Sequence, residues 1–116
     1  MSEVNEKDYE LIFQIILSAG QARTTAEEAM NKLEEYDFDA FDRLIEQAKT
    51  EYIQCHEMQT GMLNKEASGE RNEVNIFLVH AQDHITMASL TLDHARRFRK
   101  IYEELNRVRV AQSDGR

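Results

Sequence analysis

The absence of proline is the property that most constrains how this chain can fold. None of its 116 residues is proline and only four are glycine, so few positions interrupt a helix. Much of the remainder consists of residues with high helix propensity, chiefly Glu, Ala, Gln, Lys, Arg, Leu and Met. These properties predict an all-α protein. The length is that of a single domain, which we expect to span residues 1–116.

Three long segments carry regularly spaced residues, most of them apolar, at alternating intervals of three and four. This spacing is typical of helices that pack side by side at a shallow angle. The three sets are Ile12, Ile15, Ala19, Ala22, Ala26, Ala29 and Leu33, then Phe41, Ile45, Ala48, Tyr52, Cys55, Gln59 and Met62, then Val74, Leu78, Ala81, Ile85, Ala88, Leu92 and Ala95. Short connections are expected at 35–37 and 67–72. The pattern predicts an antiparallel, up-and-down three-helix bundle.

The ends of the three helices can also be predicted. Residues that cap helix N-termini precede each segment: Asn5, Asp37, and either Ser68 or Asn72. We expect the third helix to end near Val110 and residues 111–116 to form a disordered tail. Gln59 is the one amide in the second set, and we interpret it as a partly buried side chain bonded to the backbone.

The third segment has a second stripe of regularly spaced residues on a different face, here called the outer stripe. Its members are Ile76, His80, Asp83, Met87, Leu90 and His94. A helix in a monomeric three-helix bundle needs only one buried stripe. The outer stripe therefore predicts that the third helix also packs against another copy of the chain.

The charge distribution limits the classes of partner. The formal net charge is −8, which argues against nucleic acid because a nucleic-acid-binding protein normally presents a basic face. Six Lys and Arg residues nevertheless lie within 96–109. We favour their interpretation as cations near the C-terminal end of a helix, where they are stabilised by the helix dipole. A docking patch for an acidic partner is the alternative.

Cys55 is the only cysteine, which excludes an intrachain disulfide and a cysteine-rich metal site. Residues 1–7 lack the pattern of an export signal, and no run approaches the roughly 18 apolar residues of a membrane span. We therefore expect a cytoplasmic protein without direct membrane insertion.

Residues 78–85 place two imidazoles and a carboxylate on neighbouring parts of one helix. Three hypotheses fit His80, Asp83 and His84. His80 could be a nucleophile that accepts a phosphoryl group on a ring nitrogen. His80 and His84 could bind a metal, with Asp83 adding an oxygen ligand. All three could instead be hydrogen-bonded polar residues at the margin of the bundle.

The chain resembles the IIA component of the lactose/cellobiose branch of the bacterial sugar phosphotransferase system. The resemblance covers roughly Leu11 to Leu105. It rests on four strings: Ala19-Gly20-Gln21-Ala22-Arg23, Gln59-Thr60, Lys65-Glu66-Ala67-Ser68-Gly69-Glu70 and, above all, Leu78-Val79-His80-Ala81-Gln82-Asp83-His84. The last string is specific because the whole context, and not only the histidine spacing, matches in the expected place.

The resemblance implies a homotrimer of three-helix bundles that takes part in sugar uptake. It implies that His80 is phosphorylated by the phosphohistidine of the carrier HPr and then donates to a cysteine of the IIB component. It also implies that Asp83 lies on the three-fold axis, where three copies surround a divalent cation, expected to be Mg²⁺. Such a cation would offset the mutual repulsion of the carboxylates, so Asp83 would be structural.

A phosphoryl group on His80 needs hydrogen-bond donors, because the helix dipole fades within the first turn. His84 lies on the same face as His80, whereas Gln82 points elsewhere and could act across a subunit boundary. We therefore expect His84 and Gln82 to stabilise the phosphoryl group. The alternative is a non-enzymatic helical oligomer with a structural metal at His80, Asp83 and His84. The sugar could be of the lactose, cellobiose or chitobiose type.

Overall fold

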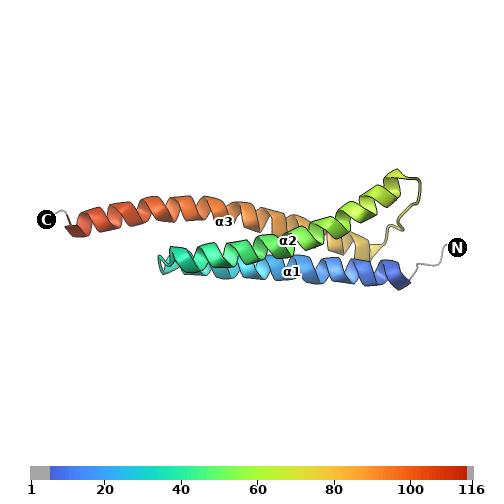
Figure 1. Ribbon diagram of the computed structural model, residues 1–116, viewed down its shortest axis with the longest axis horizontal. Coiled ribbons are helices and arrows are strands. Elements are labelled where there is room, and N and C mark those ends of the chain that lie inside the picture. The colour runs from blue at the N-terminus through green and yellow to red at the C-terminus, as the bar shows by residue number, and fades with distance from the viewer. Residues whose placement is uncertain (1–5, 115–116) are drawn as a thin grey trace.

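The computed structural model describes residues 6–114, which form three long helices (Figure 1). The helices are α1 (Glu6–Glu34), α2 (Phe38–Ala67) and α3 (Ile76–Asp114), and residues 6–114 contain no strand. Successive helices run in opposite directions, so α1 and α3 are parallel to each other and antiparallel to α2. The predicted all-α, up-and-down three-helix bundle is confirmed. In residues 6–114 no helix is long and apolar enough to cross a membrane.

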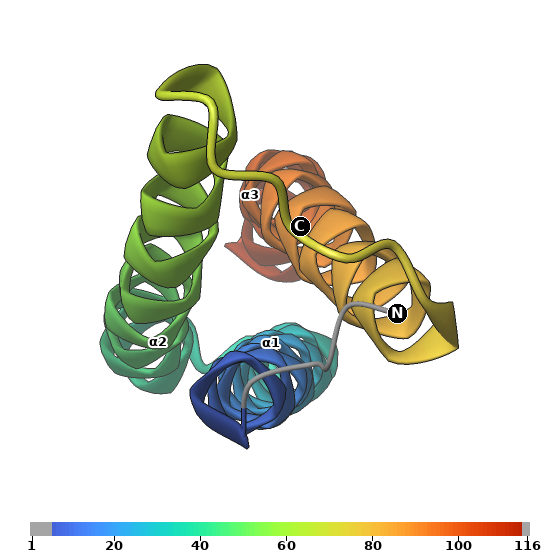
Figure 2. The ribbon, with the colours of Figure 1, turned by 90° about the vertical axis from the view of Figure 1, so that its right-hand side faces the viewer.

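Helix α1 is the centre of the packing. It contacts both other helices extensively, whereas α2 and α3 contact each other much less. Figure 2 shows the C-terminal end of α2 diverging from α1 and α3. At the opposite end of the bundle, α3 projects past the connection between α1 and α2 (Figure 1). Much of the surface of α3 therefore has no contact with its own chain.

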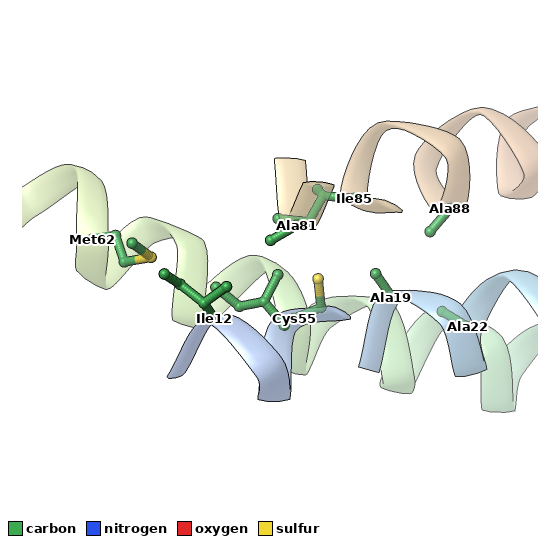
Figure 3. Packing of buried hydrophobic residues seen from close by; sticks show 9 residues of the cluster. Ile12, Ala19, Ala22, Cys55, Met62, Ala81, Ile85 and Ala88 are labelled. Atoms are coloured by element: carbon green, nitrogen blue, oxygen red, sulfur yellow. The ribbon is translucent and has the colours of Figure 1, made fainter. Parts of the chain in front are cut away.

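The core consists largely of small side chains, which allow the helices to approach closely. Figure 3 shows Ala19 and Ala22 of α1 lying near Ala81 and Ala88 of α3, and all four are fully buried. Cys55 of α2 is buried in the same cluster, and burial raises the pKa of its thiol to about 11. It is therefore protonated at neutral pH and packs as a small apolar residue.

The three predicted sets of core residues agree closely with the buried residues. Every member of the first set is buried, as are five members of the second and five of the third. Tyr52, Gln59 and Leu78 are partly exposed. Val74 is the clear error, because it is 77% exposed and lies in the connection before α3. The connection runs from 68 to 75 and is longer than the predicted 67–72.

The predicted helix caps are correct for α2 and wrong for α3. Asp37 caps α2 by accepting a hydrogen bond from the backbone N–H of Ala40 at 3.1 Å. At the start of α3, Asn75 Oδ1 accepts a hydrogen bond from the N–H of Leu78 at 3.0 Å. Ser68 instead ends α2. Asn72 donates to the Met62 carbonyl at 2.9 Å and so holds the connection against α2.

The C-terminal end of α3 also differs from the prediction. Helix α3 continues to Asp114, so residues 111–114 of the expected disordered tail are helical. The physical reason is that no proline or glycine occurs between Gly69 and residue 115 to interrupt the helix. Residues 115–116 and the predicted cap Asn5 lie outside the described residues.

The basic residues near the end of α3 are not helix-dipole cations, because the last turn of the helix contains none of them. Arg99 forms hydrogen bonds to Asp42 of α2 at 2.9 and 3.2 Å and to Glu103 at 2.8 Å. The hydrogen bond from Arg99 lowers the pKa of Asp42 below its usual value. Arg109 lies over the ring of Tyr36, 4.0 Å from its centroid. These contacts hold α3 against α2 and the connection that precedes it.

Candidate phosphoryl-transfer site

His80 and His84 lie one helical turn apart on α3 and contact each other directly. Their Nε2 atoms are 3.1 Å apart, and their rings meet edge to face with centroids 4.6 Å apart. A hydrogen bond between two Nε2 atoms needs one donor and one acceptor. When His84 donates, His80 carries its proton on Nδ1 and keeps the lone pair on Nε2. His80 is exposed, and its Nε2 lone pair can act as a nucleophile once the hydrogen bond from His84 is released.

Helix α1 lies beside this pair of histidines. A Cβ atom built at Gly20 would be 4.0 Å from Nδ1 of His84, so a longer side chain at this position would reach the imidazole. One turn further along, Arg23 contacts the sulfur of Met87 at 3.5 Å. The glycine therefore leaves space for the His84 ring, and the arginine packs against the outer stripe.

An apolar surface lies beside His80, toward the N-terminal ends of α1 and α3. Phe77, one turn before His80, meets Phe13 of α1 with ring centroids 5.6 Å apart and Tyr9 with centroids 5.8 Å apart. Phe13, Phe77 and Leu17 are all exposed. Sequence analysis missed Phe13 as a surface residue near the site. The available signal was the four-residue spacing of Tyr9, Phe13 and Leu17, which lie off the buried stripe of the first helix.

Gln82 projects from a different side of α3, toward α2. Its Oε1 accepts a hydrogen bond from Nε2 of Gln59 at 2.6 Å, which corrects the interpretation of Gln59 as bonded to the backbone. Both amides lie at a surface groove of about 270 Å³ between α2, the connection and α3. The groove is lined by Gln59, Met62, Leu63, Glu66, Asn72, Val74, Leu78, Val79 and Gln82.

Asp83 is exposed on the outer stripe, between the two sides of α3 that carry His80 and Gln82. Residues 6–114 contain no group of three His, Cys, Asp or Glu side chains that could hold a metal ion. Within a single chain, His80, Asp83 and His84 are therefore not a group that could hold one metal ion. A carboxylate in this position could ligate a cation only together with groups from other copies.

Comparisons with known proteins identify the family. Residues 10–103 match the family described as "PTS system, Lactose/Cellobiose specific IIA subunit", and the chain belongs to this family. A relative from Bacillus subtilis, the lichenan-specific phosphotransferase enzyme IIA component, is 34% identical over 93% of this chain and 98% of its own length. The protein is thus a IIA component of lactose/cellobiose type in the sugar phosphotransferase system.

Solved structures of similar proteins support the same assignment. The cellobiose-specific enzyme IIA from Bacillus anthracis has a TM-score of 0.83 and is 31% identical, with 91% of this chain and 94% of that chain covered. The IIA(chitobiose) protein of Escherichia coli, solved in complex with HPr, has a TM-score of 0.74 at 25% identity. That comparison covers 91% of this chain and 99% of the other.

Proposed function

We propose that this chain is a cytoplasmic phosphohistidine carrier for the uptake of a disaccharide of the lactose, cellobiose or chitobiose type. His80 accepts a phosphoryl group from phospho-HPr and passes it to a cysteine of the IIB component. The supporting observation is the exposed His80 ring, whose Nε2 lies 3.1 Å from Nε2 of His84 within the family motif. The complex of the chitobiose relative with HPr supports HPr as the phosphoryl donor.

The first transfer exchanges one N–P bond for another. The lone pair on Nε2 of His80 attacks the phosphorus of phospho-HPr, and the HPr imidazole leaves with the electron pair of its N–P bond. Each imidazole keeps the proton on its other ring nitrogen, so no separate proton acceptor is needed. In the second transfer a thiolate of IIB attacks the same phosphorus, and His80 leaves with its electron pair. Both steps depend mainly on in-line positioning.

His84 and Gln82 supply hydrogen-bond donors for the added negative charge. The N–H of His84 that faces Nε2 of His80 is placed to bond a phosphoryl oxygen on that atom. Gln82 is two residues from His80, which is roughly 200° around the helix, so it does not reach His80 of its own chain. Because its oxygen is bonded to Gln59, its amide N–H groups remain donors for the His80 site of a neighbouring copy.

The assembly we propose is a homotrimer in which the outer stripes of three α3 helices meet. Ile76, Leu90 and His94 are exposed in the single chain, as expected for a surface that another copy covers. Three Asp83 carboxylates would meet on the axis of such a trimer. They provide oxygen ligands suited to Mg²⁺, which would offset their repulsion and is assigned no part in phosphoryl transfer.

Phosphorylation of the purified protein tests the carrier function. Incubation with phosphoenolpyruvate, enzyme I and HPr should add one acid-labile phosphate per chain, measured by mass spectrometry. His80→Gln should add none. His56→Gln is the matched control, because it removes an exposed histidine of α2, outside the outer stripe, and should be phosphorylated normally. An unmodified wild-type protein would contradict the carrier function, and a phosphorylated His80→Gln variant would place the acceptor elsewhere.

A further inference from the structure

Arg23 of α1 lies near the pair of histidines, and the proposed function gives it no role. The other two Lys or Arg residues of α1, Lys7 and Lys32, lie near the ends of that helix. In α3 no Lys or Arg precedes Arg96, which is about four helical turns beyond His80. Arg23 is therefore the only Lys or Arg in the parts of α1 and α3 that flank the two histidines.

The Arg23 side chain starts one helical turn beyond Gly20, on the side of α1 that contacts α3. Gly20 is level with His84, because a Cβ atom built there would be 4.0 Å from Nδ1 of that ring. Residues three apart on a helix are neighbours, and long side chains lean back toward the helix N-terminus, which for Arg23 is toward Gly20. Gly20 has no side chain to stand between the guanidinium and the imidazole. Arg23 can therefore extend along α1 to the ring that contacts His80.

The contacts that the Arg23 guanidinium makes leave most of its hydrogen-bonding capacity unused. Its Nη1 donates to the thioether sulfur of Met87 at 3.5 Å, and a thioether is a weak acceptor. Its Nε is buried and makes no hydrogen bond to a described residue, although it lies 3.3 Å from a carboxylate oxygen of Glu27. That ion pair joins two half-exposed side chains, so it is weak. Both contacts can therefore be exchanged for a stronger anionic partner.

A phosphoryl group on His80 adds a charge of about −1.5 to −2 beside an existing carboxylate. Asp83 lies three residues from His80 on the same helix, and its charge repels that of the group. His84 offers one N–H, and the neutral amide of Gln82 offers N–H donors but no net charge. A planar guanidinium supplies both a full positive charge and two parallel N–H donors, the geometry that phosphate oxygens accept.

We propose that Arg23 binds the phosphoryl group while that group is on His80 of the same chain. This inference rests on the proposed function, in which His80 is the acceptor. The guanidinium leaves Glu27 and the sulfur of Met87, donates to two phosphoryl oxygens and keeps its proton throughout. The only covalent bonds that form and break are those of the N–P exchange itself. Arg23 stabilises phospho-His80 relative to phospho-HPr, and so sets how far the phosphoryl group moves from HPr to this chain.

Substitution of Arg23 tests this role through the position of the exchange equilibrium. Purified phospho-HPr is mixed with the unphosphorylated chain, and the phosphate on each protein at equilibrium is measured by mass spectrometry. Arg23→Gln should lower the equilibrium constant for transfer to His80 about tenfold, because a charge-assisted contact to the group is lost. Arg23→Lys keeps the charge but not the paired donors, and should lower it less. Arg43→Gln removes an exposed arginine of α2 and should leave it unchanged.

Glu27 provides a second test, which separates phosphoryl binding from a structural role. If Arg23 acted only through its ion pair with Glu27, removal of either side chain should lower the equilibrium constant equally. Phosphoryl binding predicts opposite effects. Glu27→Gln removes the carboxylate that competes for Arg23, so it should raise the equilibrium constant about threefold, and less in a chain that also carries Arg23→Gln. Circular dichroism and thermal unfolding check that each variant remains folded.

The outcomes separate this inference from the proposed function. A wild-type equilibrium constant in Arg23→Gln would overturn the inference, as would equal decreases in Arg23→Gln and Glu27→Gln. An equal decrease in Arg43→Gln would also overturn it, because net charge alone would then be sufficient. If Arg23→Gln does not fold, Arg23→Lys and Glu27→Gln decide, since they should shift the constant in opposite directions. A wild-type protein that takes no phosphate at His80 contradicts the carrier function instead, and with it any phosphoryl binding by Arg23.

Discussion

The two halves of α3 carry different kinds of residue on the same helix face. In the half of α3 up to His94, here called the transfer half, this face carries His80, Asp83 and His94 among apolar residues. In the half beyond His94, here called the distal half, it carries Phe98, Ile101, Leu105 and Val108. Polar groups weaken an apolar contact because their water must be removed without full compensation. In the trimer that we propose, the apolar half of this face would therefore contribute more association free energy than the half that carries His80 and Asp83.

Among variants that keep His80, loss of the hydrogen-bond donor His84 should slow phosphoryl transfer the most. We expect His84→Ala to slow phosphoryl transfer from HPr about a hundredfold, because the hydrogen bond that Nε2 of His84 makes toward His80 is lost. The trimer should be unaffected. Rapid-quench measurement of phosphate on His80 gives the rate, and His56→Ala, at an exposed position of α2, is the control. An unchanged rate would show that His84 does not stabilise the transferred group.

In the proposed trimer, removal of the Asp83 carboxylates should make the transfer half resemble the distal half. Asp83→Leu replaces three clustered charges by apolar side chains, and we expect it to tighten the trimer by about tenfold or more. Its thermal midpoint should not respond to Mg²⁺ or to EDTA, whereas that of the wild type should. Sedimentation and thermal unfolding check both expectations. Dissociation of this variant into folded monomers would contradict the placement of Asp83 on the axis.

Loss of the hydrogen bond between Gln59 and Gln82 should slow phosphoryl transfer less than loss of His84 does. We expect Gln59→Leu to reduce the transfer rate about fivefold, because Gln82 would lose the bond that fixes its amide. The lifetime of the phosphohistidine should shorten in parallel, which a purely structural change would not cause. Gln54→Leu, at an exposed position of α2, is the matched control. A slower rate in the control as well would remove this role from Gln59.

The contact between Asp42 of α2 and Arg99 of α3 should have the smallest effect, and it concerns the stability of the fold. Arg99 lowers the pKa of Asp42, so its stabilising contribution is present above the unfolded pKa near 3.8 and is lost as pH falls through the folded value. Because Asp42 is exposed, Asp42→Asn should cost less than about 1 kcal/mol at pH 7, and nothing once the pH is below the folded pKa of Asp42. Thermal unfolding between pH 7 and pH 2 measures the difference, with Glu57→Gln, at an exposed position within α2, as control. A difference that does not shrink in acid would exclude this ion pair as its cause.

The sequence predicted most of the core because helix periodicity is a local property. The buried alanines of α1 and α3 follow directly from spacings along each helix. Val74 and Asn75 show where prediction from helix periodicity fails. The apolar pattern continues through Val74, but α3 begins only at Ile76, after the Asn75 cap. The spacing of residues alone does not show where backbone hydrogen bonding begins.

The contacts of the candidate site are likewise of two kinds, those within one helix, which the sequence predicted, and those between helices, which it did not. His80 and His84 were predicted to lie close together because they are four residues apart on one helix, and they do. The pairing of Gln59 with Gln82 joins α2 to α3, and that of Arg99 with Asp42 does the same. No local pattern predicts which side chains of two helices meet, because that depends on how the helices are aligned along each other and on their tilt.

The amino-acid sequence by itself determined the helical architecture, the alanine-rich core and the two histidines of the site, since each depends on the 3.6-residue repeat of a single helix. Only the tertiary structure decided which faces remain uncovered. Helix α3 extends past the connection between α1 and α2 and has few contacts with α2. His80, Asp83 and the apolar residues beyond them therefore lie on an exposed face. Whether a residue is exposed depends on how all three helices pack, whereas the spacing of apolar residues is a property of one helix.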